Sequence, residues 1–177
     1  MKKGKARKTT AFLGIDPGKN GAAFLYSSAG NHHYIDWSDD VQLIIGTVMQ
    51  WKEDFKIEYA VLEIPSAIPG QNIKATASQF ENVGQWRMLL QVLQIPYAGL
   101  SPTQWMKGLI PKMKRTNVSD SADKKARKTL NYKKAMELYP TESEIFSGPK
   151  GGIKDGRADA ALMAEKARRV YLGIEVK

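Results

Sequence analysis

Four acidic residues stand where a carboxylate is costly, and together they could hold a metal ion. Asp16 ends the apolar run of FLGIDPGKNG, and Glu63 lies in the apolar context AVLEIP. Withdrawing a carboxylate from water is unfavourable unless a positive partner offsets the loss. Asp155 and Asp159 are four residues apart in DGRADAALMAE, so a helix would place both like charges on one face. A cation bound among these carboxylates would offset both costs.

Each of the four residues also has a separate explanation that needs no metal. Asp155 could cap a helix or favour its N-terminal dipole, and Asp16 could be a turn-forming residue of DPG. Glu63 could pair with a buried Arg or Lys. A solvated helix face explains Asp159 less well, because its neighbours in ADAALMA are apolar. One acidic metal site explains all four positions together, and we prefer it for that reason.

The composition limits which metal could bind. The chain has no cysteine, which excludes disulfides and thiolate metal sites. The ligands must therefore be carboxylates, with His32 and His33 as the available imidazoles, and we expect those two in a solvated turn. Oxygen ligands favour a hard divalent cation, so we predict Mg²⁺ or Mn²⁺.

The elements that must position these residues are predicted from apolar periodicity. Two apolar runs, TAFLGID and GAAFLYSS, flank turn residues and predict a β-hairpin, which HHYIDWS extends by a third strand. Amphipathic spacing predicts helices over 39–55, behind Ser38 as N-cap, and over 75–94. IEYAVLEI and IPYAGLSP predict further strands, and DGRADAALMAEKARRVYLG a last helix. This order is typical of an α/β fold with a mixed sheet flanked by helices.

The charge predicts a polyanionic partner. The formal net charge is +9, which favours nucleic acid, with an anionic membrane surface as the alternative. No apolar run approaches the length of a transmembrane helix and no cleavable leader follows the basic start, so we expect a soluble, unprocessed protein. With 177 residues, 42% of them hydrophobic, we expect a basic disordered tail over 1–10 and one domain over 11–177, with a basic flexible loop near 112–127.

Four motifs occur in one order along residues 11–172: GIDPGKNGA, VLEIPSAIPGQ, IPYAGLSPTQWMKGL and DGRADAALMAE. In this combination they resemble the RuvC-like Holliday-junction resolvases, particularly the phage-type and chloroplast-type relatives. The resemblance implies a ribonuclease H-like fold with a mixed five-stranded sheet and a homodimer that acts on four-way DNA junctions with Mg²⁺ or Mn²⁺. It also implies an intracellular location, in a bacterium, a phage-infected cell or an organelle. The extended basic N-terminus and the polar loop from Thr116 to Asp123 depart from the family pattern.

Carried over to this chain, the resemblance makes Asp16, Glu63, Asp155 and Asp159 the catalytic, metal-binding tetrad. Two divalent ions about 3.5 to 4 Å apart can activate water, neutralise the anionic transition state and stabilise the leaving alkoxide. In this hypothesis Asp16 bridges the ions, Glu63 ligates one, and Asp155 with Asp159 ligates the other. The chain would then be a crossover junction endodeoxyribonuclease, which makes symmetric nicks in the junction.

We predict DNA contacts in three places: the loop after Glu63, the basic residues between Lys112 and Lys128, and Arg157. They are Pro69, Gly70, Gln71, Lys74, Lys112, Lys114, Arg115, Lys124, Lys125, Arg127, Lys128 and Arg157. The loop around Gln71 could also be only a rigid turn, and Arg157 could only screen the repulsion of the aspartates beside it. The two-fold symmetry of the substrate favours a homodimer, with the helix over 75–94 as the candidate interface.

Three other functions compete with junction resolution. An actin-like or sugar-kinase-like ATPase needs a duplicated domain and a second Gly-rich strand turn, which this chain lacks. A module that binds branched DNA or structured RNA without cutting would explain the charge but not the four carboxylates. A ribonuclease H-like nuclease could instead cut another branched DNA or an RNA–DNA hybrid.

Overall fold

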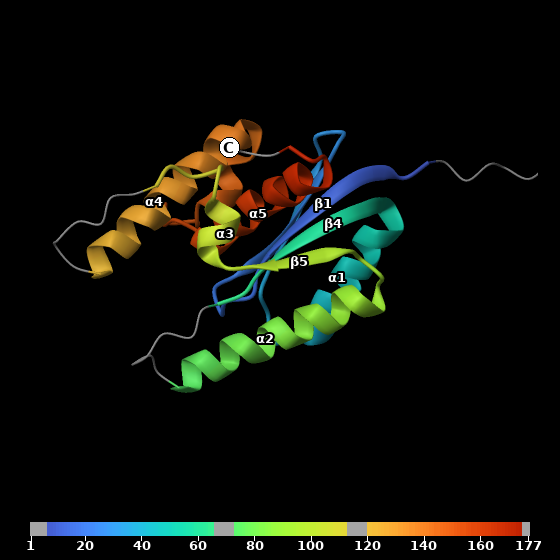
Figure 1. Cartoon of the computed structure of the whole chain (residues 1–177), viewed down its shortest axis with the longest axis horizontal. Coiled ribbons are helices and arrows are strands. Elements are labelled where there is room, and N and C mark those ends of the chain that lie inside the picture. The colour runs from blue at the N-terminus through green and yellow to red at the C-terminus, as the bar shows by residue number, and fades with distance from the viewer. Residues whose placement is uncertain (1–6, 66–72, 113–119, 175–177) are drawn as a thin grey trace, which may run out of the picture.

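A single five-stranded sheet forms the centre of the computed structural model, which describes residues 7–65, 73–112 and 120–174 (Figure 1). The strands are β1 (Thr9–Asp16), β2 (Ala22–Ser27), β3 (His32–Asp36), β4 (Phe55–Glu63) and β5 (Tyr97–Leu100), in the spatial order β3-β2-β1-β4-β5. The first three strands pair antiparallel, whereas β1, β4 and β5 are parallel. The predicted mixed sheet of an α/β fold is confirmed, but His32 and His33 begin β3 instead of lying in the predicted solvated turn.

Helices cover both faces of the sheet. Helices α1 (Val41–Asp54) and α2 (Ile73–Val92) lie on one face, and α3 (Pro102–Met106), α4 (Asp120–Leu138) and α5 (Asp155–Tyr171) lie on the other (Figure 1). A short 3-10 helix, η1 (Pro140–Phe146), connects α4 to the segment before α5. None of the described helices combines the length and apolarity that crossing a bilayer requires.

Three predicted boundaries are wrong. Strand β1 begins at Thr9, so residues 9 and 10 of the predicted disordered tail belong to the sheet. Helix α4 begins at Asp120, so residues 120–127 of the predicted flexible loop are helical. This part of the chain, DSADKKAR, contains no Gly or Pro, and its Ala, Lys and Arg residues favour a helix. In α1 the cap is Asp40 rather than Ser38, because the Asp40 carboxylate accepts the Leu43 N–H at 3.2 Å. Ser38 instead accepts the N–H of Asp40 through its hydroxyl.

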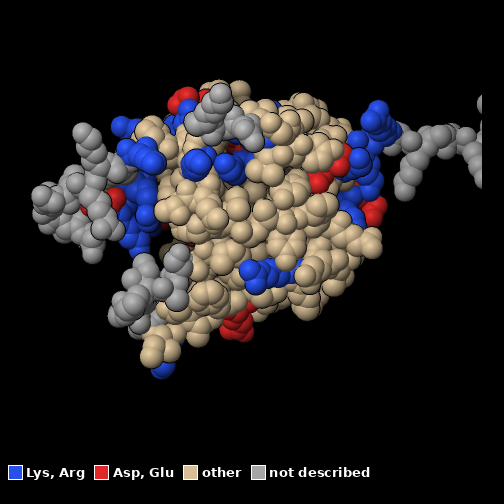
Figure 2. Space-filling view, in the orientation of Figure 1, with Lys and Arg blue, Asp and Glu red and all other residues tan. Residues whose placement is uncertain are grey.

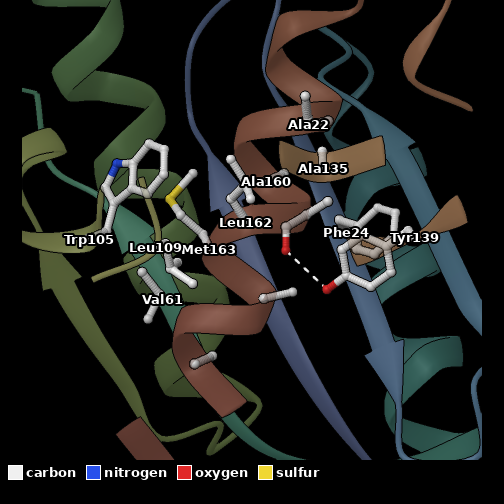
Figure 3. Close-up of a cluster of buried hydrophobic side chains, with 14 of the residues drawn as sticks. Ala22, Phe24, Val61, Trp105, Leu109, Ala135, Tyr139, Ala160, Leu162 and Met163 are labelled. Atoms are coloured by element: carbon white, nitrogen blue, oxygen red, sulfur yellow. Dashed lines mark hydrogen bonds between the residues drawn. The ribbon is translucent and has the colours of Figure 1, made fainter. Parts of the chain in front are cut away.

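The alternation of side chains along β1 divides the core into two layers. Ala11, Leu13 and Ile15 pack with α1 and α2, where Trp86 is fully buried. Phe12 lies in the other layer, with residues of α5 such as Met163. Figure 3 shows this second layer, in which the Tyr139 hydroxyl donates a hydrogen bond to the Ala161 carbonyl at 3.2 Å.

Glycines allow α5 to lie unusually close to β1 and to the turn that follows it. A Cβ atom on Gly14 would stand 2.0 Å from the Ala160 carbonyl oxygen, which real Cβ atoms essentially never do. A Cβ atom on Gly156, in the first turn of α5, would stand 2.1 Å from the Asn20 carbonyl oxygen. Only glycine permits these backbone contacts. They hold the start of α5 against the end of β1, where Asp16 lies.

Candidate active site

Asp16 and Glu63 lie at the same edge and on the same face of the sheet. Ile15 of β1 pairs with Leu62 of the parallel strand β4, so each carboxylate follows directly on a paired position. Because side chains alternate along a strand, Asp16 shares the face of Phe12, and Glu63 shares the face of Val61. Both of those apolar residues belong to the layer that packs against α5. The sequence predicts this proximity only if the two strands are neighbours, which the structure shows.

Asp155 and Asp159 join them from the start of α5. Asp155 is in the first turn, but the N-cap residue is Lys154, whose side chain makes no capping hydrogen bond. Capping therefore does not explain Asp155. The charges of Asp16, Glu63 and Asp155 all act on Asp159, which shows that the four carboxylates form one electrostatic cluster.

Burial makes ionisation of this cluster unfavourable. Withdrawal from water, reinforced by the charge of Glu63, raises the pKa of Asp16 to about 7. Burial and then the charge of Asp16 raise the pKa of Asp159 to about 8. Burial also raises the pKa of Glu63, although its hydrogen bond with Trp105 acts in the opposite direction. Near neutral pH the cluster therefore attracts either protons or cations.

In the described part of the chain, each carboxylate has one hydrogen-bond or ion-pair partner. The Gly18 N–H donates to Asp16 at 2.9 Å, and the Trp105 indole N–H donates to Glu63 at 2.7 Å. The Asn131 side-chain amide donates to Asp159 at 2.8 Å. The fourth partner is charged, because the Lys128 ammonium forms an ion pair with Asp155. Among the described residues, Lys128 is thus the cation that directly contacts a member of the cluster.

The chemistry of these ligands fits a hard divalent cation, but their present positions do not form a complete metal site. All four groups offer carboxylate oxygens, which Mg²⁺ and Mn²⁺ prefer. Within the described residues, however, no three acidic or histidine side chains already lie close enough together to bind one ion. Binding would require the side chains to turn toward one another and Asp155 to release Lys128. The metal therefore stays a prediction.

Sequence reasoning missed two of the residues that contact the cluster. Trp105 lies in the motif SPTQW, but nothing in its spacing indicates that its indole would reach Glu63, 42 residues away in sequence. Asn131 is only 3% exposed, and its second amide atom, Oδ1, has no hydrogen-bond partner among the residues that the structure describes. A polar residue facing inward on α4 is the one signal that could have indicated Asn131.

The predicted DNA-binding residues are placed unevenly. Lys112 and, on α4, Lys124, Lys125 and Arg127 are exposed. Figure 2 shows Lys and Arg side chains gathered over α4, with few acidic residues among them. Lys74 is exposed in the first turn of α2, whereas Lys128 turns toward Asp155. Five further predictions, Pro69, Gly70, Gln71, Lys114 and Arg115, lie outside the described residues.

Arg157 has a partner that its sequence position does not indicate. Its guanidinium donates two hydrogen bonds, both 2.6 Å long, to the carboxylate of Asp36 on β3. It also donates to the Ile145 carbonyl at 2.9 Å and lies over the Tyr34 ring, 4.3 Å from the centroid. This pairing lowers the pKa of Asp36. Arg157 thus pairs directly with Asp36 rather than with an aspartate of α5, and its contact with a phosphate stays a prediction.

Solved structures with the same fold were found by structural comparison. RuvC of Thermus thermophilus in complex with a Holliday junction substrate superposes with a TM-score of 0.57 over 93% of this chain and 94% of that one, at 14% sequence identity. A second Thermus thermophilus RuvC structure superposes with a TM-score of 0.55 over 92% and 96% of the two chains, at 13% identity. The chain has a RuvC-like fold. No family model and no curated protein matches its sequence.

The metal-free protein should become less stable toward unfolding as the pH rises. Asp16 and Asp159 have raised pKa values, about 7 and about 8, so between pH 4 and pH 8 the folded state binds protons that the unfolded state has released. Their stabilising contribution is complete below about pH 4 and is lost as the pH passes these two values. We expect urea unfolding in EDTA to show lower stability at pH 8 than at pH 5.5.

The Asp16→Asn/Asp159→Asn double variant is the control, because it removes both titrations. Its stability should change less between the two pH values than that of the parent protein. Equal changes in both proteins would contradict the assignment of the pH dependence to these carboxylates.

Proposed function

We propose that this chain is a metal-dependent endodeoxyribonuclease that resolves four-way DNA junctions by paired nicks. The observation that carries this proposal is the cluster formed by Asp16, Glu63, Asp155 and Asp159 at one edge of a RuvC-like fold. A buried group of like charges costs stability, so a metal-binding role accounts for it better than packing does. The junction bound to Thermus thermophilus RuvC supports a branched DNA substrate.

The four carboxylates would hold Mg²⁺ or Mn²⁺, with two ions as the expected number. When bound, the ions would supply charge neutralisation and a water of lowered pKa at the scissile phosphate. Asp155 would exchange its contact with Lys128 for a metal contact. The Lys128 side chain, 43% exposed, would then be available to a DNA phosphate beside the cluster. The lysines and Arg127 of α4 would hold the flanking backbone, which makes binding depend strongly on salt.

Trp105 and Asn131 would orient the carboxylates rather than touch DNA. Each donates one hydrogen bond to a member of the cluster, to Glu63 and Asp159 respectively, from a position that is at least nine-tenths buried. Partners of this kind fix the direction of a metal ligand and adjust its basicity.

Replacing Trp105 by Phe should lower cleavage about 10- to 100-fold, the usual cost of removing a group that orients a metal ligand. The substitution keeps an aromatic ring in the core but removes the indole N–H that donates to Glu63. Loss of that donor should raise the pKa of Glu63 further, which shifts the acidic limb of the pH–rate profile upward. Rates measured from pH 5 to pH 9 test this. A variant that loses activity equally at every pH would indicate only a packing defect.

Helix α2 would form the homodimer interface. Its residues Ile73, Met88 and Val92 are 84%, 61% and 72% exposed, and Phe80 is 42% exposed. The inward side of the same helix is occupied by buried Trp86. Apolar side chains exposed along one helix are typical of an interaction surface. A second copy of the chain fits the two-fold symmetry of a four-way junction.

One cleavage assay tests the proposal. A labelled four-way junction, a linear duplex and an RNA–DNA hybrid are incubated with the protein in Mg²⁺, in Mn²⁺ and in EDTA. We expect symmetric nicks in the junction alone, and none in EDTA. Cleavage of the hybrid would instead assign another ribonuclease H-like activity, and junction binding without cleavage in either metal would assign a binding module.

A further inference from the structure

A groove beside Asp155 is lined by residues that the proposed function has not used. It has a volume of about 600 Å³ and lies between the β1–β2 turn and the loop over 148–154. Lys19 and Asn20 line it from the turn, and Lys150 and Lys154 line it from the loop. Asp155 itself belongs to the lining. The groove therefore leads directly to the candidate active site.

The groove carries net positive charge. Lys19, Lys150 and Lys154 are exposed, and none of them forms an ion pair with a described residue. Of the two acidic residues in its lining, Asp36 is paired with Arg157 through two hydrogen bonds, and Asp155 forms an ion pair with Lys128. Three lysine charges thus remain available for an anion.

The loop that carries two of these lysines has a defined shape. The Gly148 N–H donates to the Gly152 carbonyl at 2.7 Å, and the Gly151 N–H donates to the Gly148 carbonyl at 2.8 Å. Gly151 has φ of +74°, which favours glycine at this position. A bridge between Ser147 and Ile153 closes the hairpin. Lys150 is consequently held at the tip of a tight turn, next to the start of α5.

The candidate active site lies between this groove and the basic surface of α4. Asp155 contacts Lys128 of α4 and also lines the groove. A polyanionic chain bound across Asp155 would therefore meet lysines on both sides of the carboxylate cluster. Phosphates spaced along a nucleic acid strand match such an arrangement, whereas a single small anion would need only one side.

We propose that the groove binds backbone phosphates of the cleaved DNA strand, on the side of the scissile phosphate opposite to α4. Lys19, Lys150 and Lys154 neutralise these phosphates, and Arg157 holds Asp36 within the same lining. The inference rests on the proposed nuclease function and adds a second phosphate-binding subsite to it. Its lysines carry no sequence information, because they contact phosphate rather than base edges.

Equilibrium binding of a labelled four-way junction in EDTA, at several salt concentrations, tests the subsite without cleavage. The triple variant Lys19→Gln/Lys150→Gln/Lys154→Gln should bind about 10- to 100-fold more weakly near 0.1 M salt. The slope of log K against log salt should become shallower by about 2 to 3, since each lost phosphate contact removes roughly 0.9. All three side chains are exposed, so the thermal unfolding temperature should stay unchanged.

Lys56→Gln is the matched control for the single variant Lys150→Gln. Lys56 is also exposed, but it lies near the start of β4, at the end of the sheet away from Glu63. We expect Lys150→Gln to lower the salt slope by about 1 and Lys56→Gln to leave it unchanged. If the triple variant, Lys56→Gln and the parent protein all have the same salt slope, the proposed subsite is wrong.

Phosphate-ethylation interference then locates the subsite on the DNA. Ethylated phosphates on one side of the cleavage position should weaken binding of the parent protein but not of the triple variant. Identical interference patterns for the two proteins would overturn the proposal. Failure of the nuclease function appears separately, as no cleavage by the parent protein in Mg²⁺ or Mn²⁺ while the salt slopes still differ. A parent protein that binds no DNA would overturn both.

Discussion

Replacing Asp16 by Asn is expected to lower the rate of junction cleavage by about a thousandfold. A metal-held transition state gains several kcal/mol of charge stabilisation, and each 1.4 kcal/mol is roughly tenfold in rate. The amide keeps the shape of the carboxylate, and its oxygen can still accept the Gly18 N–H. The loss would therefore report the missing charge. Single-turnover cleavage of a labelled junction in Mg²⁺ measures the effect.

The same substitution should stabilise the metal-free protein at pH 8. Burial and the charge of Glu63 raise the pKa of Asp16 to about 7, so at pH 8 folding forces an unfavourable ionised carboxylate into the cluster. Asn carries no such cost. We expect the variant to have a higher thermal unfolding temperature than the parent in EDTA at pH 8, and a smaller difference at pH 5. Activity lost together with stability would contradict this account, because it would indicate misfolding.

A surface carboxylate provides the control for both measurements. Asp54, at the end of α1, forms an exposed hydrogen bond with Gln50 and does not act on the cluster. Asp54→Asn should leave cleavage within about twofold of the parent rate and should not change the pH dependence of unfolding. A comparable loss of cleavage in this variant would show that the assay responds to net charge rather than to the site.

Replacing Gly14 by Ala is expected to cost about 3 kcal/mol of stability or more, even though only one methyl group is added. The new Cβ atom would lie 2.0 Å from the Ala160 oxygen and 2.3 Å from the Ala164 nitrogen. Both are backbone atoms of α5, so a side-chain rotation cannot relieve the clash and the whole helix must move. For a domain of this size the unfolding temperature should fall by roughly 6 to 12 °C.

Cleavage by Gly14→Ala should fall as well, measured well below its unfolding temperature. Gly14 lies two residues before Asp16, and α5 carries Asp155 and Asp159, so movement of the helix separates carboxylates that must act together. Gly46→Ala in α1 is the matched control, because a Cβ atom there meets nothing within 4 Å. It should be neutral or stabilising by about 0.5 to 1 kcal/mol. Similar losses for both variants would contradict the close-packing explanation.

The order and type of the elements could be predicted because they depend on local patterns. Alternating and helical spacing of apolar residues identified the β1–β2 hairpin, β4 and α5. The start of α4 was missed, because a lysine-rich segment has few apolar residues with which to show a helical period. Asp40 was passed over as the cap of α1 because Ser38 is also a good capping residue, and only backbone geometry separates the two.

The acidic residues of the candidate site could likewise be predicted from sequence, because a carboxylate in an apolar run is conspicuous wherever it occurs. Their partners could not. Trp105 reaches Glu63 across 42 residues, and Arg157 reaches Asp36 across 121 residues. Such pairs arise from strand order and from the approach of α5 to β1, and no local pattern records either.

The sequence by itself identified the charged side chains that an apolar interior does not accommodate without a partner. It thereby identified the candidate functional residues. Only the tertiary structure decided that these charges share one cluster, that Lys128 neutralises Asp155 within it, and that a lysine-lined groove leads to it. The physical reason is that a charged residue within an apolar run can be recognised from the residue itself and its neighbours in sequence, and the run implies that its charge will be costly to bury. Its compensation depends on distances between distant segments, which exist only after the chain has folded.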